Sequence, residues 1–167
     1  RKLFLLAGSW AFYASWSPRF LVLLIATTWI DFQLARVIHR ARAVSPARAR
    51  ALLVASLCLN LGLLAYFKYG LFLYESADAL LALPPAPGFL AVVVPLGISF
   101  YTFHSISYVI DTYRGIRPPT DSFSDFALYV AFFPQLIAGP ITRWGFFGPQ
   151  LATPPHVGMA RIEASLF

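Results

Sequence analysis

Residues 20–37 read FLVLLIATTWIDFQLARV, an apolar stretch in which only Asp31 and Arg36 are charged. A helix needs about 20 mostly apolar residues to cross the roughly 30 Å hydrocarbon core of a bilayer. Similar apolar stretches flank it at residues 3–16, 51–67 and 90–110. The first of these is short, which indicates a tilted or truncated span. The pattern predicts an all-α fold, a polytopic bundle of transmembrane helices.

The composition of the whole chain excludes several classes of protein. Its 167 residues are 59% hydrophobic, 17% aromatic and only 12% charged, whereas an ordinary soluble domain is about 25% charged. A freely soluble monomer and a disordered chain are both excluded. The single cysteine, Cys58, excludes a disulfide framework and a cysteine-based zinc site, and no cluster of metal-ligating residues is visible.

Positive charge is concentrated after the second apolar stretch. Five arginines fall within fifteen residues, with no acidic residue among them: Arg36, Arg40, Arg42, Arg48 and Arg50. By the positive-inside rule this connecting loop faces the cytoplasm. The net charge of +6 then reflects topology and attraction to the anionic lipid bilayer rather than a nucleic-acid partner. Asp31 and Arg36, five residues apart, could pair loosely near the inner interface, although such a spacing more often reflects topology than chemistry.

The segment at residues 123–138 differs from the other apolar stretches. Ser122 and Asp125 have the spacing of a capping box at a helix start. Pro134 then interrupts the segment, and Pro140 lies just beyond its end. Broken helices at membrane depth are tolerated where they are buried in protein or line a cavity. The sequence therefore predicts a broken or re-entrant half-helix near Pro134–Pro140.

Residues 90–110 contain more polar side chains than any other predicted span. Tyr101, His104 and Tyr108 fall on one face of a helix. They are expected either to line a substrate tunnel or to form hydrogen bonds between packed helices. His104 has the chemistry of a general base, but no second histidine or carboxylate stands beside it at a catalytic spacing.

Arg143 and Trp144 follow the predicted half-helix. A guanidinium group beyond a broken helix can hold an anionic group such as a phosphate or a carboxylate. The pair could equally be an anchor at the membrane interface. Both readings stay open from the sequence.

Five motifs together carry a resemblance to a known family. They are FKY at residues 67–69, PLGISFYTF at residues 95–103, ISY at residues 106–108, DTYRG at residues 111–115 and FPQLIAGPI at residues 133–141, which is followed by Arg143. In order and spacing they resemble successive motifs of the membrane-bound O-acyltransferases, most closely the branch that acetylates alginate. The resemblance extends over about residues 1–167.

The resemblance implies that residues 1–167 are the N-terminal, membrane-embedded part of a larger multi-pass enzyme of the bacterial inner membrane. Such an enzyme transfers an acyl group, commonly acetyl, from a thioester donor to hydroxyls of an exopolysaccharide such as alginate. The donor is acetyl-CoA or an acyl carrier, and no bound cofactor is expected. The implied partners are the lipid bilayer, the polysaccharide acceptor and periplasmic or extracellular subunits of an acetylation complex.

The catalytic histidine of the family lies in a Trp-His-Gly motif, which has no match here. Trp144 is followed by Gly145, and His156 lies between Pro155 and Val157. The resemblance therefore assigns no catalytic residue to this chain, which alone should be inactive. It does imply a tunnel for the donor, and the residues expected to line it are Tyr101, His104, Tyr108 and Arg143.

Two alternatives remain open from the sequence. One is D-alanyl transfer to teichoic acid, which differs in donor and acceptor. The other is a non-catalytic membrane protein, a transporter or a subunit of an export complex. A transporter would be favoured by paired broken segments in two repeated halves, and only one such segment is visible. A Trp-His-Gly motif in sequence downstream of this chain would favour the enzyme.

Overall fold

The computed structural model describes residues 1–81 and 93–152. The first residues of the predicted span at 90–110, and His156, lie outside the described residues. Within the described ranges all regular structure is helical: α1 (Lys2–Trp16), α2 (Pro18–Val44), α3 (Pro46–Leu81), α4 (Ile98–Arg114), α5 (Phe123–Ala131), α6 (Phe133–Ala138) and α7 (Trp144–Ala152).

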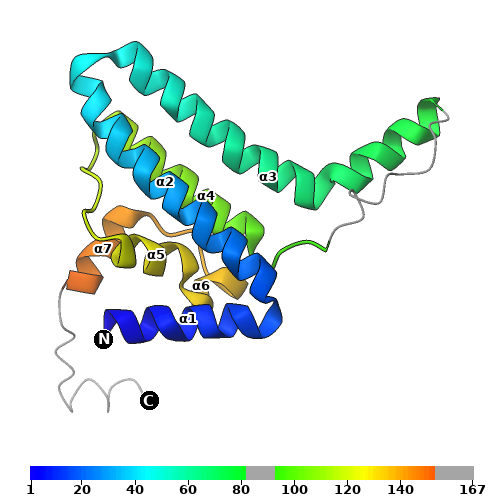
Figure 1. Cartoon of the computed structure of the whole chain (residues 1–167), viewed down its shortest axis with the longest axis horizontal. Helices are drawn as coiled ribbons and strands as arrows, with labels where there is room; N and C mark the ends of the chain where they lie inside the picture. Colours follow the sequence, from blue (N-terminus) through cyan, green and yellow to red (C-terminus); the bar gives the residue numbers. More distant parts are fainter. Residues whose placement is uncertain (82–92, 153–167) are drawn as a thin grey trace.

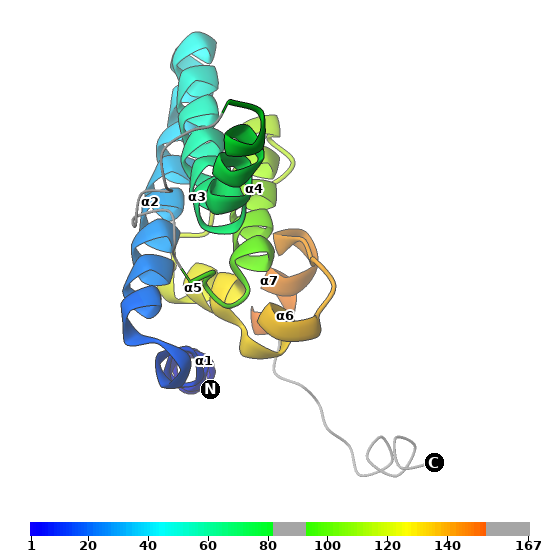
Figure 2. The same ribbon diagram turned by 90° about the vertical axis from the view of Figure 1, so that its right-hand side faces the viewer.

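Three long helices, α2, α3 and α4, lie side by side (Figures 1 and 2). Helices α2 and α3 form an antiparallel hairpin, and α4 packs against both of them. Both hairpin helices are long and apolar enough, by length and composition, to cross a membrane. The later part of α3 leads away from the other helices (Figure 1), and the buried residues of α3 all lie between Ala49 and Leu64.

Helices α1 and α6 lie at the end opposite the hairpin turn, whereas α5 and α7 pack against the middle of α2 and α4. Helix α1 crosses obliquely near the start of α2 (Figures 1 and 2) and contacts α2, α5 and α6. Its 15 residues rise about 22 Å, which is less than the thickness of a bilayer core. Pro18 stands at the first position of α2, where its missing N–H removes no helical hydrogen bond.

The arginine-rich stretch is helical, and the prediction of a connecting loop there was wrong. Helix α2 continues to Val44 and α3 begins at Pro46, so only the extended residue Ser45 separates them. Alanine and arginine, which dominate this stretch, are strong helix formers. The next proline, Pro46, starts a helix rather than breaking one.

The break predicted in residues 123–138 is confirmed. Phe132 adopts an extended conformation between α5 and α6, and Pro134 follows within the first turn of α6, where no backbone donor is needed. The Ser122 hydroxyl caps α5 by accepting a hydrogen bond from the Asp125 amide at 3.3 Å. The Asp125 carboxylate does not complete the capping box, because it forms an ion pair with the Lys2 ammonium group at 2.7 Å.

Candidate functional site

Helix α4 carries most of the polar residues expected to act, and its start is fixed by a tight turn. The Ile98 amide donates to the Pro95 carbonyl at 3.2 Å, and Gly97 is left-handed with φ of 67°. A Cβ atom at Gly97 would lie 2.9 Å from the carbonyl oxygen of Leu136 in α6. Glycine is therefore needed both for its conformation and for the close approach of α4 to α6.

The structure brings three of the four predicted tunnel residues together on one buried face of α4. Tyr101, His104 and Tyr108 are 4%, 0% and 2% exposed. The Tyr108 ring lies 4.4 Å from the Phe126 ring of α5, and its hydroxyl accepts a hydrogen bond from the Thr120 amide at 2.8 Å. Tyr108 thus holds the connection between α4 and α5 as well as lining the helix face.

His104 is the chemically unusual member of this face. Neither of its ring nitrogens has a hydrogen-bond partner among the described residues, and its ring centroid lies 5.0 Å from that of Tyr129. Every imidazole offers at least one N–H donor. Leaving such a group buried and unpaired costs about 1–3 kcal/mol. His104 is therefore the residue here best suited to meet a ligand, a water molecule or another part of a larger protein.

Tyr129 of α5 belongs to the same site, although no motif in the sequence marks it. It is fully buried, and its hydroxyl donates to the Thr142 carbonyl at 2.8 Å and lies 3.3 Å from the Ser107 hydroxyl. It links α4, α5 and the segment before α7. The signal in the sequence that Tyr129 is buried is the uninterrupted apolar run around it, residues 126–133.

Arg143 does not join the buried face. Its side chain is 70% exposed, and its Nη1 atom lies 3.9 Å from an oxygen of Asp111. The adjacent Trp144 packs edge-on against the rings of Tyr108 and Tyr129, at 5.7 and 5.5 Å between centroids. Trp144 is thus a packing residue of the aromatic cluster rather than an exposed interfacial anchor, while Arg143 remains open to solvent or to an anion.

A second polar cluster lies deep between α2, α3 and α4. The Asp31 side chain is fully buried and accepts hydrogen bonds from the Ser56 hydroxyl at 2.9 Å and from the Asn60 amide at 2.9 and 3.0 Å. The Ser105 side chain of α4 is a further hydrogen-bond partner. One carboxylate therefore joins three helices, and Ser105 places this cluster directly next to His104 in the sequence of α4.

The predicted pairing of Asp31 with Arg36 was wrong. The Arg36 guanidinium lies over the Phe32 ring, 5.3 Å from its centroid. Hydroxyl and amide donors from α3 and α4 already surround the Asp31 carboxylate, so it needs no cation. The Arg36 side chain instead turns back one helical turn to this ring, and Arg36 forms no ion pair with Asp31 among the described residues.

Sequence alignments to curated relatives extend over most of the chain. It is 40% identical over 162 residues to a protein of Pseudomonas syringae pv. tomato named "Probable alginate O-acetylase AlgI", an alignment that covers 93% of this chain. The protein of the same name from Pseudomonas aeruginosa is 41% identical over 150 residues, covering 86% of this chain. The chain is similar to alginate O-acetylases along most of its length. The resemblance predicted from the motifs is confirmed.

A relative with a different substrate in its name also aligns. The "Peptidoglycan O-acetyltransferase" of Helicobacter pylori is 34% identical over 173 residues, covering 89% of this chain. The chain spans only 28–32% of the length of these three relatives. No protein-family model matches the chain, and no solved structure matches it significantly.

Proposed function

We propose that this chain is the N-terminal, membrane-embedded part of a bacterial O-acyltransferase that transfers acetyl groups to hydroxyls of an exopolysaccharide such as alginate. The observation that carries the proposal is the 40% identity to an alginate O-acetylase over 93% of the chain. The peptidoglycan O-acetyltransferase supports it, because the two names share O-acetyl transfer to a polysaccharide. They favour this reaction over D-alanyl transfer and over a transport role.

The proposed location is the bacterial inner membrane, with several spans. Helices α2 and α3 have the length and apolar character of spans, and the arginines at their shared end favour a cytoplasmic position for that end. An acyl thioester, either acetyl-CoA or an acyl carrier, would then enter from the cytoplasm. The polysaccharide and the partner subunits of an acetylation complex would lie on the other side.

The proposed reaction is a simple acyl transfer. A sugar hydroxyl oxygen attacks the thioester carbonyl, the new C–O ester bond forms and the C–S bond breaks. A general base takes the hydroxyl proton, which leaves with the thiol. The base is expected in the part of the relatives' length that this chain does not span. The present chain would contribute tunnel wall through Tyr101, His104 and Tyr108, with Arg143 near an opening, and a wall that excludes water limits hydrolysis of the thioester.

The test is complementation by the full-length protein. It would be expressed in a bacterium that makes alginate but lacks its own O-acetylation gene, and the acetyl esters of the purified polymer would be quantified. Restored acetylation is expected. Polymer without acetyl esters, at normal levels of the protein in the membrane, would contradict the proposal. In the same strain His104→Gln should lower acetylation several-fold. The control is Phe103→Ala, which should leave acetylation unchanged because the Phe103 side chain is 40% exposed.

A further inference from the structure

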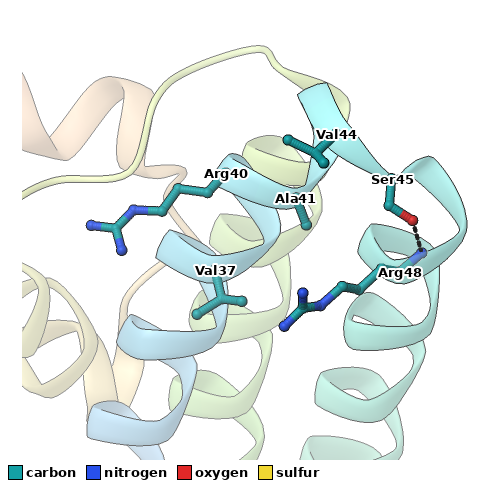
Figure 3. A pocket seen from close by; sticks show the side chains of 6 residues that line it. All are labelled: Val37, Arg40, Ala41, Val44, Ser45 and Arg48. Carbon is teal, nitrogen blue, oxygen red and sulfur yellow. Dashed lines mark hydrogen bonds between the residues drawn. The ribbon is translucent and has the colours of Figure 1, made fainter.

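The end of the α2–α3 hairpin contains a pocket that the proposed acetyl transfer does not use. Its volume is about 300 Å³, and its lining residues are Val37, Arg40, Ala41, Val44, Ser45 and Arg48. Arg48 reaches from α3 toward α2, while Arg40 extends from the other side of α2 (Figure 3). A second pocket of about 190 Å³ shares Arg40 and is also lined by Arg36 and His39. The hairpin end therefore presents cations around an apolar surface.

The positive charge at this end is not neutralised by the described part of the chain. The ion pairs among the described residues join Lys2 to Asp125 and Arg143 to Asp111, and neither includes an arginine of the hairpin end. Asp121 lines the second pocket but makes no ion pair with its arginines among the described residues. Arginine forms paired hydrogen bonds to phosphate oxygens in a fork geometry, so an unpaired arginine at a pocket is suited to a phosphate group.

The position of the pocket relative to the bilayer favours a lipid as the source of that phosphate. The 27 residues of α2 rise about 40 Å, which exceeds a hydrocarbon core of about 30 Å. The last turns of α2 would therefore lie among the lipid headgroups. Val37 and Val44, beside the arginines, are 37% and 86% exposed, which suits contact with the glycerol and acyl region of a lipid better than contact with water.

We infer that the pocket at the α2–α3 hairpin binds the phosphate headgroup of an anionic membrane phospholipid. Arg48 donates to the phosphate, Arg40 adds positive charge beside the pocket from the other side of α2 (Figure 3), and Val37 and Val44 contact the apolar part of the lipid. The inference rests on the proposed membrane location but not on acetyl transfer. Anionic lipids are enriched at the cytoplasmic leaflet, where they attract basic segments.

The test uses the full-length protein in vesicles of phosphatidylcholine with added phosphatidylglycerol, followed by purification and counting of retained phosphatidylglycerol by native mass spectrometry. The variant is Arg40→Gln with Arg48→Gln. Its matched control is Arg50→Gln with Arg114→Gln, which removes two charges from the same end at exposed positions outside the pocket. The pocket variant should retain about tenfold less lipid, a loss expected when charged hydrogen bonds disappear, and the control should resemble the unmodified protein.

Several results would overturn the lipid site. Equal losses in the two double variants would mean general electrostatic attraction, and no loss in either would mean that no site exists. Displacement of phosphatidylglycerol by coenzyme A or inorganic phosphate would assign the pocket to a soluble anion. Arg40→Lys with Arg48→Lys should give an intermediate loss, because the charge remains without the fork. Failure to enter phosphatidylcholine vesicles at all would instead contradict the membrane location.

Discussion

Asp31 is a single side chain on which the packing of three helices depends. Replacing it by alanine leaves the donors of Ser56 and Asn60 buried without their acceptor. Each orphaned donor costs about 1–3 kcal/mol in a protein interior, and somewhat less between membrane helices. We expect Asp31→Ala to lower stability by about 2 kcal/mol or more, measured as thermal unfolding of the full-length protein in detergent.

The comparison with two further variants makes the Asp31 prediction specific. Asp31→Asn keeps one acceptor oxygen and should cost less than Asp31→Ala. Glu75→Ala, at an exposed position of α3, should change stability by no more than about 0.5 kcal/mol. Equal melting temperatures for Asp31→Ala and Glu75→Ala would show that the buried cluster does not hold the helices together.

Two left-handed glycines at the ends of α4 should tolerate alanine to different degrees. Gly97 and Gly115 have φ of 67° and 74°, which costs any other residue about 1–2 kcal/mol. A Cβ at Gly97 also meets the backbone of Leu136, whereas at Gly115 it meets the flexible guanidinium end of Arg42. Gly97→Ala should therefore lower the melting temperature clearly more than Gly115→Ala. A larger effect at Gly115 would mean that the α4–α6 contact is looser than described.

At the scale of elements, the aromatic cluster fixes how α5 meets the segment before α7. The Tyr129 hydroxyl donates a hydrogen bond to the carbonyl of the half-buried Thr142. Tyr129→Phe keeps the ring and removes this bond, so it should lower stability by about 1 kcal/mol and speed proteolytic cleavage near residues 139–143. The matched control is Tyr113→Phe, because Tyr113 is only half-buried. Unchanged cleavage in Tyr129→Phe would show that other contacts fix this segment.

The sequence predicted most of these elements because they depend on local patterns. Apolar runs indicated the long helices, and the cap at Ser122 and the break before Pro134 were visible as residue types at fixed spacing. The arginine-rich stretch was misread because charge suggested a loop, while the helix propensity of alanine and arginine decided the structure. The extent of α3 beyond residue 67 was missed for a similar reason, since no strong helix breaker precedes Leu81.

The polar contacts between helices were harder to predict than the helices. Whether Asp31 meets Arg36 or Asn60 depends on how α2 rotates against α3, which periodicity along one helix does not determine. A signal was present, since Ser56 and Asn60 stand one turn apart in an otherwise apolar run. Polar residues within predicted spans usually face other helices. Applied to residues 51–67, that rule would have pointed to a buried partner such as Asp31.

At the scale of the whole molecule, the same hairpin sets both the orientation and the lipid contact. If the arginines that flank Ser45 at the hairpin turn face the cytoplasm, residues near the far end of α3 must lie on the opposite side of the membrane. The distance along α3 from Pro46 to Ser76 is about 45 Å at the helical rise, long enough to cross a bilayer. Orientation is therefore testable on one helix, independently of any enzymatic activity.

The test replaces Cys58, the single cysteine of this chain, with alanine in a cysteine-free full-length protein and adds Ser45→Cys or Ser76→Cys. A membrane-impermeant maleimide should label Ser76→Cys in intact spheroplasts, and Ser45→Cys only after the membrane is opened, because the arginine-rich end is held on the cytoplasmic side. The reverse pattern would invert the orientation and move the arginine pocket to the outer leaflet. Labelling of both sites in intact spheroplasts would show that α3 does not span the membrane. That result would contradict both the lipid site and the donor entry proposed at the cytoplasmic end of α3.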